Sequence, residues 1–256
     1  MFTTPVSLGK LGGIEASHIY RYLTVGPALV RGYSLYTNAG IYCENEQSLI
    51  DWCERYIKAV QDLDYVLHWC PEQGDEFVIK KVGSGKALTD FNQLEPFTHG
   101  EAGWHYGLAD RKVLCVSPLS DTVTRQAEKY GDIWPGASIG DVVAVRSTYS
   151  EALTGLDPVD WRDKMSRLKD EISKADFDFA VVGCGGYSLE ICQFIKAMGK
   201  SVVHLGGAVQ LLFGIRGKRW DGCFGSMPWY GTQAWVRPMP HEVPVKSELV
   251  ENGCYW

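Results

Sequence analysis

The stretch that decides the fold is residues 176–220, DFDFAVVGCGGYSLEICQFIKAMGKSVVHLGGAVQLLFGIRGKRW. It reads as a strand, a glycine turn and a helix, followed by a second strand, a second glycine turn and a second helix. The apolar, β-branched run 177–182 is typical of a strand buried on both faces, and residues 201–205 predict another. Two consecutive parallel strands joined by a crossover helix form a right-handed βαβ unit. We therefore expect an α/β fold, a Rossmann-like three-layer sandwich with a mostly parallel central sheet.

Both glycine turns follow a strand directly, and ligands of parallel sheets bind beyond the carboxyl ends of the strands. Glycine lets the chain turn sharply and lets a ligand approach the backbone, because no Cβ is in the way. A cationic run follows the second turn, and it also fits a solvated basic face. The ligand-binding residues predicted from this part of the chain are Gly183, Gly185, Gly186, Tyr187, His204, Gly206, Gly207, Gln210, Arg216, Lys218 and Arg219.

Composition narrows the class of protein. A chain of 256 residues can bury a full core, and we predict one domain over 1–256. The net charge of −6 argues against broad, non-specific binding of nucleic acid. No run of about 18 apolar residues and no N-terminal apolar segment occurs, which predicts no membrane span. The eight cysteines form no C-x-x-C pair, so we expect a reduced, cytoplasmic protein, and the nine tryptophans and thirteen tyrosines favour a homodimer.

A third glycine-containing turn lies near the N-terminus. Residues 6–8 are a short apolar start, Gly12 and Gly13 form a turn, and residues 16–23 have helical spacing. Glu15 then lies in the first turn of a helix, where a carboxylate interacts favourably with the helix dipole. The alternative is a carboxylate directed at a metal or a sugar hydroxyl.

A hydroxyl-rich turn follows the predicted strand 111–116. Ser117, Ser120 and Thr122 precede or open a helix, and free N–H groups with small hydroxyls at a helix start bind anions. Plain N-capping by Ser120 or Asp121 is the other interpretation. The two interpretations are compatible.

Most of the remaining sequence predicts helices and strands of the scaffold. Residues 46–60 and 160–174 predict amphipathic helices, and 64–69 and 141–145 predict strands. The aromatic and proline-rich segment 221–256 contains too much tryptophan for a disordered tail and is expected to pack back on the domain.

Three further segments are candidates for a strand, a phosphate loop and a metal site. Residues 77–82 (FVIKKV) are interpreted as a strand. Residues 83–86 (GSGK) lack the full spacing of a phosphate loop. The loop around His99, Glu101 and His105 has metal-binding side chains, but no fixed ligand spacing supports a metal site there.

Three stretches carry a family resemblance. Residues 10–15 (KLGGIE) are similar to an R-x-G-D-G-E turn, and residues 113–118 (VLCVSP), with Thr122 and Gln126, are similar to a strand, S-P-F turn and helix. The closest similarity runs through residues 177–220, where HLGG and QLLFGI match nearly letter for letter, and includes the ending GCYW. These motifs resemble a bacterial and viral family of small proteins with a glycosyltransferase D-type (GT-D) fold.

The resemblance implies a Rossmann-like glycosyltransferase. It implies a nucleotide-sugar donor such as UDP-glucose, an acceptor hydroxyl on a glycan, a protein or a modified nucleic acid, and Mn²⁺ or Mg²⁺ held by a D-x-E carboxylate pair. It singles out Glu15 as the catalytic group and metal ligand, and Arg219 as a cation for the diphosphate. Asp121, Glu101, His105 and Glu190 are the open alternatives for a general base.

The chain departs from the family where Gly13 replaces the aspartate of the carboxylate pair. Two carboxylates hold Mg²⁺ or Mn²⁺ better than one. Three explanations stay open: one carboxylate suffices, cations such as Arg216, Lys218 and Arg219 neutralise the diphosphate, or the activity differs.

Two other classes compete with the transferase. The turn 183–188 is placed like a dinucleotide fingerprint, which suggests NAD or S-adenosylmethionine, but Ser188 replaces the third glycine and His204 replaces the acidic ribose ligand. A non-catalytic nucleotide-sugar-binding module is the third class, because Gly13 removes a metal ligand.

Overall fold

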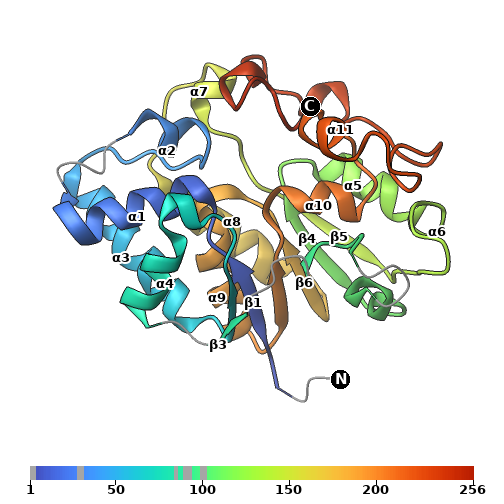
Figure 1. Cartoon of the computed structure of the whole chain (residues 1–256), viewed down its shortest axis with the longest axis horizontal. Helices are drawn as coiled ribbons and strands as arrows, with labels where there is room; N and C mark the ends of the chain where they lie inside the picture. Colours follow the sequence, from blue (N-terminus) through green and yellow to red (C-terminus); the bar gives the residue numbers. More distant parts are fainter. Residues whose placement is uncertain (1–3, 28–31, 84–85, 89–93, 99–102) are drawn as a thin grey trace.

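The computed structural model describes residues 4–27, 32–83, 86–88, 94–98 and 103–256. Within them, seven strands form one sheet in the order β3-β2-β1-β7-β6-β4-β5, and every pairing is parallel (Figure 1). The strands are β1 (Ser7–Lys10), β2 (Tyr65–Leu67), β3 (Lys86–Leu88), β4 (Val113–Ser117), β5 (Val142–Arg146), β6 (Phe179–Val182) and β7 (Ser201–His204). The predicted α/β architecture with a parallel central sheet is confirmed.

The organising βαβ unit forms as expected. Strand β6 leads through α9 (Ser188–Ala197) to β7, and the two strands pair in parallel with Val182 opposite His204. Both glycine turns therefore lie at the same edge of the sheet.

Helices cover both faces of the sheet, which makes three layers (Figure 1). Side chains alternate along the buried strands: Ala180 and Val182 belong to the core cluster on one face, and Val181 to the cluster on the other. The first face is covered by α1 (Gly13–Val25), α3 (Glu46–Asp62), α4 (Asp75–Val82), α8 (Trp161–Lys174) and α9. The second is covered by α5 (Ser120–Ala127), α6 (Tyr130–Ile133), α10 (Val209–Leu212) and α11 (Lys218–Phe224).

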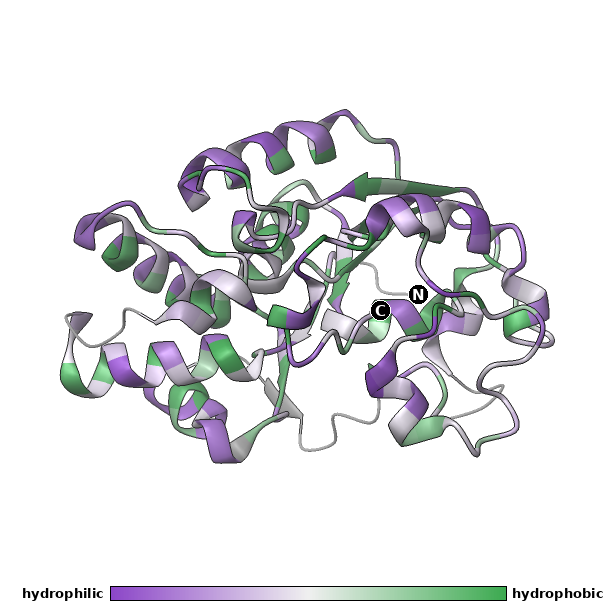
Figure 2. Cartoon of the chain, turned by 90° about the horizontal axis from the view of Figure 1, so that it is seen from above, coloured by the Kyte–Doolittle hydropathy of each residue, from purple (hydrophilic) through white to green (hydrophobic). Residues whose placement is uncertain are grey.

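The long helices are amphipathic, as their sequences predict. Hydrophilic and hydrophobic residues alternate along them in Figure 2. Asn45 caps α3 by accepting from the Ser48 N–H at 2.8 Å, and Asp160 caps α8 by accepting from the Arg162 N–H at 3.0 Å. Short helices complete the fold: α2 (Tyr33–Thr37), α7 (Glu151–Thr154), and the 3₁₀ turns η2 (Pro71–Gln73), η5 (Trp104–Leu108), η6 (Gly185–Tyr187), η7 (Gly206–Ala208), η8 (Pro240–Glu242) and η9 (Ser247–Leu249).

The segment 221–256 lies against the rest of the chain. Tyr230 and Trp235 belong to the core cluster on the second face of the sheet. The Gln126 side-chain amide donates to Ala234 O at 2.8 Å, and the Arg216 N–H donates to Val236 O at 2.7 Å. The C-terminus lies beyond the carboxyl ends of the strands, at the end of the molecule opposite the start of β1 (Figure 1).

The strand predicted over 77–82 is wrong, because these residues form helix α4. Left-handed glycines bound the helix, Gly74 at φ 86° and Gly83 at φ 69°. The Asp75 carboxylate accepts from the N–H groups of Trp69 and Cys70, at 2.6 and 2.9 Å, and ties the helix start to the end of β2. The helix that Ser120 opens ends at Ala127, and α6 follows it as a separate helix. Of the glycine-lysine segment 83–86, Ser84 and Gly85 lie outside the described residues.

His105 is a core histidine. Its side chain is fully buried, Nε2–H donates to Pro96 O at 2.8 Å, and Nδ1 accepts from the Tyr130 hydroxyl at 2.9 Å. Burial lowers the pKa of His105 to about 4. Both ring nitrogens are therefore used, and His105 is excluded as a metal ligand and as a general base. His99 and Glu101 lie outside the described residues.

No helix in the described ranges combines the length and apolar character that crossing a membrane requires.

The buried His105 predicts a loss of stability in acid. Its folded pKa lies below the ordinary value, so the unfolded chain binds more protons between about pH 6.5 and pH 4, and stability falls as the pH falls. At about pH 5, this histidine alone lowers the free energy of unfolding by about 2 kcal/mol relative to pH 7. His105→Gln removes that contribution, which urea unfolding at the two pH values measures. An unchanged pH slope in the variant contradicts the assignment.

Candidate functional site

A cavity of about 650 Å³ lies at the carboxyl edge of the sheet. The segments that follow β1, β2, β4, β5, β6 and β7 all line it, together with the end of the chain. Parallel pairing explains this convergence, because it places the carboxyl ends of all strands at one edge. The cavity brings together eleven of the predicted site residues: Gly12, Gly13, Glu15, Ser117, Gly183, Gly185, His204, Gly206, Gly207, Gln210 and Arg219.

Six predicted residues are absent from the described lining of this cavity: Ser120, Thr122, Gly186, Tyr187, Arg216 and Lys218. Arg216 pairs with Asp221 at 3.3 Å, and the Lys218 ammonium lies 3.4 Å from Asn252 O. The three cations therefore do not act together: Arg219 is in the described lining of the cavity, and Arg216 and Lys218 are not.

Lys10 is a cavity residue that the sequence analysis missed. It ends β1, its side chain is buried, and its Nζ lies 3.1 Å from the Glu95 carboxylate and 3.6 Å from the centre of the Trp69 ring. Burial lowers the pKa of Lys10, although Glu95 opposes the shift. A lysine that ends an otherwise small and apolar strand was the available signal.

His204 lies beside Lys10 at the end of β7. Its Nδ1 is 2.9 Å from Lys10 O, and since a carbonyl oxygen only accepts, Nδ1 carries the hydrogen. Burial, with the nearby Lys10 charge, lowers the pKa of His204 to about 3, so the ring is neutral. Its Nε2 is therefore a hydrogen-bond acceptor. A Cβ added at Gly206 would lie 3.7 Å from this nitrogen, which places Nε2 next to the second glycine turn.

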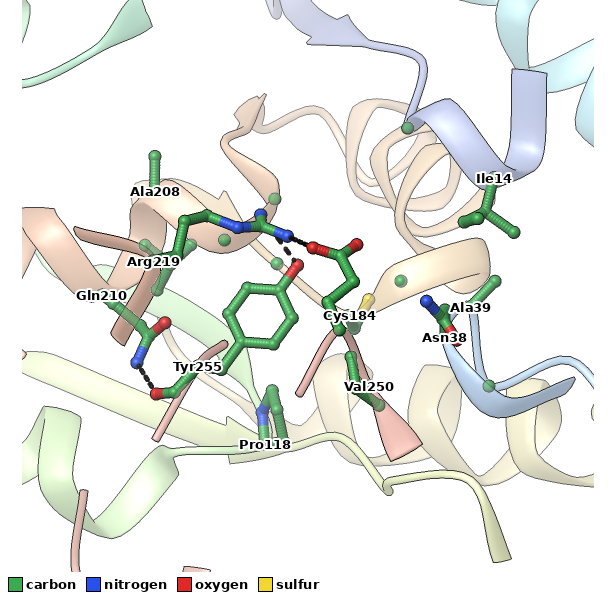
Figure 3. Close-up of a pocket in the computed structure, with 18 of the residues that line it drawn as sticks. Ile14, Asn38, Ala39, Pro118, Cys184, Ala208, Gln210, Arg219, Val250 and Tyr255 are labelled. Atoms are coloured by element: carbon green, nitrogen blue, oxygen red, sulfur yellow. Dashed lines mark hydrogen bonds and ion pairs between the residues drawn. The ribbon is translucent and has the colours of Figure 1, made fainter. Parts of the chain in front are cut away.

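Arg219 is held at the cavity by the end of the chain. Its Nη1 donates to the Tyr255 hydroxyl at 3.2 Å, and its Nη2 pairs with the Glu251 carboxylate. Figure 3 shows the Arg219 side chain directed at the Tyr255 hydroxyl, while Gln210 donates to the Tyr255 carbonyl at 2.8 Å. The guanidinium is thus oriented by side chains of the C-terminal segment.

The glycines after β6 have a packing role that was not predicted. A Cβ at Gly185 would lie 2.6 Å from Ala39 O, and one at Gly186 would lie 2.5 Å from the Ile41 side chain. The Gly186 N–H donates to Ala39 O at 2.9 Å, and the Tyr187 hydroxyl donates to Gly40 O at 3.0 Å. The chain's own segment 39–41 therefore occupies the space next to this turn. The predicted ligand-binding role of Gly186 and Tyr187 is corrected to a structural one.

The helix start at α5 binds an anion, as its sequence suggests, but the anion belongs to the protein. The buried Glu242 carboxylate accepts from the Asp121 N–H at 2.8 Å and the Thr122 N–H at 3.2 Å, and it contacts the Thr122 hydroxyl. The residue at the N-cap position is Leu119, so capping by Ser120 or Asp121 is wrong. Glu242 satisfies these donors in place of a phosphate.

Asp121 and Glu190, two of the candidates for the general base, form ion pairs within the protein. Asp121 lies 2.7 Å from His241, and Glu190 pairs with Arg55 and, at 2.5 Å, with Lys169. Neither residue lines the cavity.

The residues around Glu15 do not fit Mn²⁺ or Mg²⁺. Glu15 is buried, and burial raises the pKa of its carboxyl group, which disfavours the charged form that a metal needs. A Cβ at Gly13 would lie 2.1 Å from the Gln73 amide oxygen, so a neutral amide fills the place beside Glu15. Over the described part of the chain, the one compact group of three potential ligands is Asp121, His241 and Glu242, and Glu242 already accepts from backbone N–H groups.

No family model, curated protein or solved structure matches this chain.

The contact between Gly185 and segment 39–41 predicts a large cost for Gly185→Ala. Gly185 and Gly199 both have positive φ angles, 59° and 80°, but a Cβ at Gly199 meets nothing within 4 Å. Gly199→Ala is the matched control and should cost about 1 kcal/mol for its backbone conformation alone. Gly185→Ala should cost about 3 kcal/mol, since the added methyl also overlaps Ala39 O. Chemical denaturation measures both, and equal losses would refute the packing role.

Proposed function

We propose that this chain is a glycosyltransferase that binds a nucleotide-diphosphate sugar, linked through UDP, in the cavity at the carboxyl edge of the sheet. The observation that supports this most is the position of two cations, Lys10 and Arg219, on a cavity that three glycine turns also line. Diphosphate needs positive charge and close backbone approach, and these residues supply both kinds of group.

The size and lining of the cavity suit such a donor. Its volume of about 650 Å³ lies within the range of small-molecule sites, roughly 300–1,000 Å³. Trp69, Trp220 and Tyr255 offer aromatic surface for a base or a sugar ring. Ser147 is 5% exposed, lines the cavity, and its hydroxyl has no hydrogen-bond partner among the described residues, so it can bond to a bound ligand.

The proposed reaction uses the chain's own side chains. The bond from the sugar C1 to the diphosphate oxygen breaks, and a bond from C1 to the acceptor oxygen forms. Arg219 and Lys10 stabilise the charge that develops on the departing diphosphate. Glu15 lines the cavity and, in its carboxylate form, takes the proton of the acceptor hydroxyl; its raised pKa makes that carboxylate a stronger base. The neutral His204 accepts a hydrogen bond from a substrate hydroxyl.

The dinucleotide alternative has less support. The fingerprint turn requires backbone N–H groups that face a phosphate. Here the Cys184 N–H donates to the Ser188 hydroxyl at 3.0 Å, and the Gly186 N–H donates to Ala39 O. These donors are used within the protein.

A thermal-shift panel tests the proposal. We expect UDP-glucose at about a hundred times its Kd to raise the Tm by roughly 5 °C or more, with no shift from NAD or S-adenosylmethionine. Release of UDP on incubation with acceptors distinguishes an enzyme from a binding module. Stabilisation by NAD alone would overturn the transferase proposal.

Arg219 and Arg216 form a matched pair for locating the donor. Arg219→Gln should weaken UDP binding by about 10- to 100-fold, because a charge-assisted hydrogen bond contributes roughly 1.5–3 kcal/mol. Arg216→Gln should leave the affinity unchanged, since Arg216 pairs with Asp221 and does not line the cavity. Isothermal titration of both variants gives the comparison. Equal affinities in Arg219→Gln and the unmodified chain would exclude Arg219 from the site.

A further inference from the structure

We infer that the cavity neutralises a diphosphate with the side chains of Lys10 and Arg219 and binds it without a divalent cation. The inference rests on the proposed function and concerns how the same site holds its ligand. Three observations carry it: the placement of Lys10, the shared cavity of the two cations, and the residues that surround Glu15.

The Lys10 ammonium group has more hydrogens than its described hydrogen bond uses. A buried ammonium group is costly unless it is paired, and it offers three hydrogens. Among the described residues its one hydrogen-bond partner is Glu95, at 3.1 Å, while the Trp69 ring covers another side. Its other ammonium hydrogens can therefore bond to a ligand in the cavity that Lys10 lines.

Lys10 and Arg219 approach the cavity from different parts of the fold. Lys10 ends β1, whereas Arg219 lies in α11 and is oriented by Tyr255. Burial is the main cause of the lowered pKa of Lys10, and the Arg219 charge is the smallest of the causes that act on it. The diphosphate of a nucleotide sugar carries a negative charge on each phosphate and would match one cation with each. The neutral His204 beside Lys10 adds no further charge.

The same cavity has poor ligands for a metal. Gly13 supplies no side chain, and the Gln73 amide fills the adjoining space. The lining has three glutamates, Glu15, Glu72 and Glu251, and over the described residues none of them belongs to a compact group of three potential metal ligands. Hard divalent cations favour charged oxygen ligands, usually more than one. Lys10 and Arg219 thus balance the negative charge of the diphosphate, which a metal ion would otherwise do.

The first experiment compares metal conditions on the unmodified chain. UDP is titrated calorimetrically into the protein in EDTA and again in MnCl₂, with Mn²⁺ alone as a further titration. We expect the Kd for UDP to agree within about twofold, and Mn²⁺ alone to give no binding heat. UDP binding that appears only with Mn²⁺ overturns this inference and leaves the proposed function intact. Failure of UDP to bind in either condition overturns both.

The second experiment tests Lys10 with a matched control. The described part of the chain holds two buried lysine–glutamate pairs. In Lys10–Glu95 the lysine lines the cavity, and the side chains are 7% and 5% exposed; in Lys164–Glu151 neither residue lines it, and the side chains are 6% and 10% exposed. Lys10→Met/Glu95→Gln removes the first pair without leaving a buried charge, and Lys164→Met/Glu151→Gln removes the second.

We expect the first double variant to weaken UDP binding in EDTA by at least tenfold and the second to change it by less than twofold, with circular dichroism confirming both folds. Equal weakening in the two, or none in the first, refutes the role of Lys10. The EDTA comparison on the unmodified chain decides the metal question whether or not either variant folds.

Discussion

The pairing of β1 with β7 is the constraint on which the site depends. It places Leu8 opposite Val203 and joins the N-terminal strands, β1 to β3, to the C-terminal strands, β4 to β7. The junction brings strands from the two halves of the chain side by side, and ligands of parallel sheets bind beyond the carboxyl ends of the strands. The hydrogen bond from His204 to Lys10 O crosses the junction just beyond the paired residues. A buried cation and a neutral imidazole with a fixed tautomer meet there because of this pairing.

The protein itself occupies much of the edge of its sheet. Segment 39–41 lies against the turn after β6, and Glu242 accepts from the N–H groups at the start of α5. Buried backbone donors need partners, and internal carbonyl and carboxylate groups provide them without any ligand. The open part of the edge is consequently the cavity, which the segments after six of the strands and the C-terminal segment line. Its charged lining differs from a carboxylate-based metal site, since Lys10 and Arg219 face it alongside the buried Glu15.

The sequence predicts what depends on local pattern and misses what depends on distant partners. The βαβ unit and most of the cavity-lining glycines follow from buried strands and the turns after them. Helix α4 was missed because FVIKKV has no clear period, and tertiary contacts of Asp75 fix its start. Glu242 lies far along the chain from Thr122, so no local signal joins them. Lys10 was missed because its burial arises only when β1 enters the centre of the sheet.

A crystal structure of the chain with UDP-glucose, grown in EDTA, tests the central claim most directly. The account predicts electron density for the diphosphate in the cavity, with its oxygens within hydrogen-bond distance of Lys10 Nζ and the Arg219 guanidinium. Density for the nucleotide at the start of α5, or at any other site away from these two cations, would contradict it.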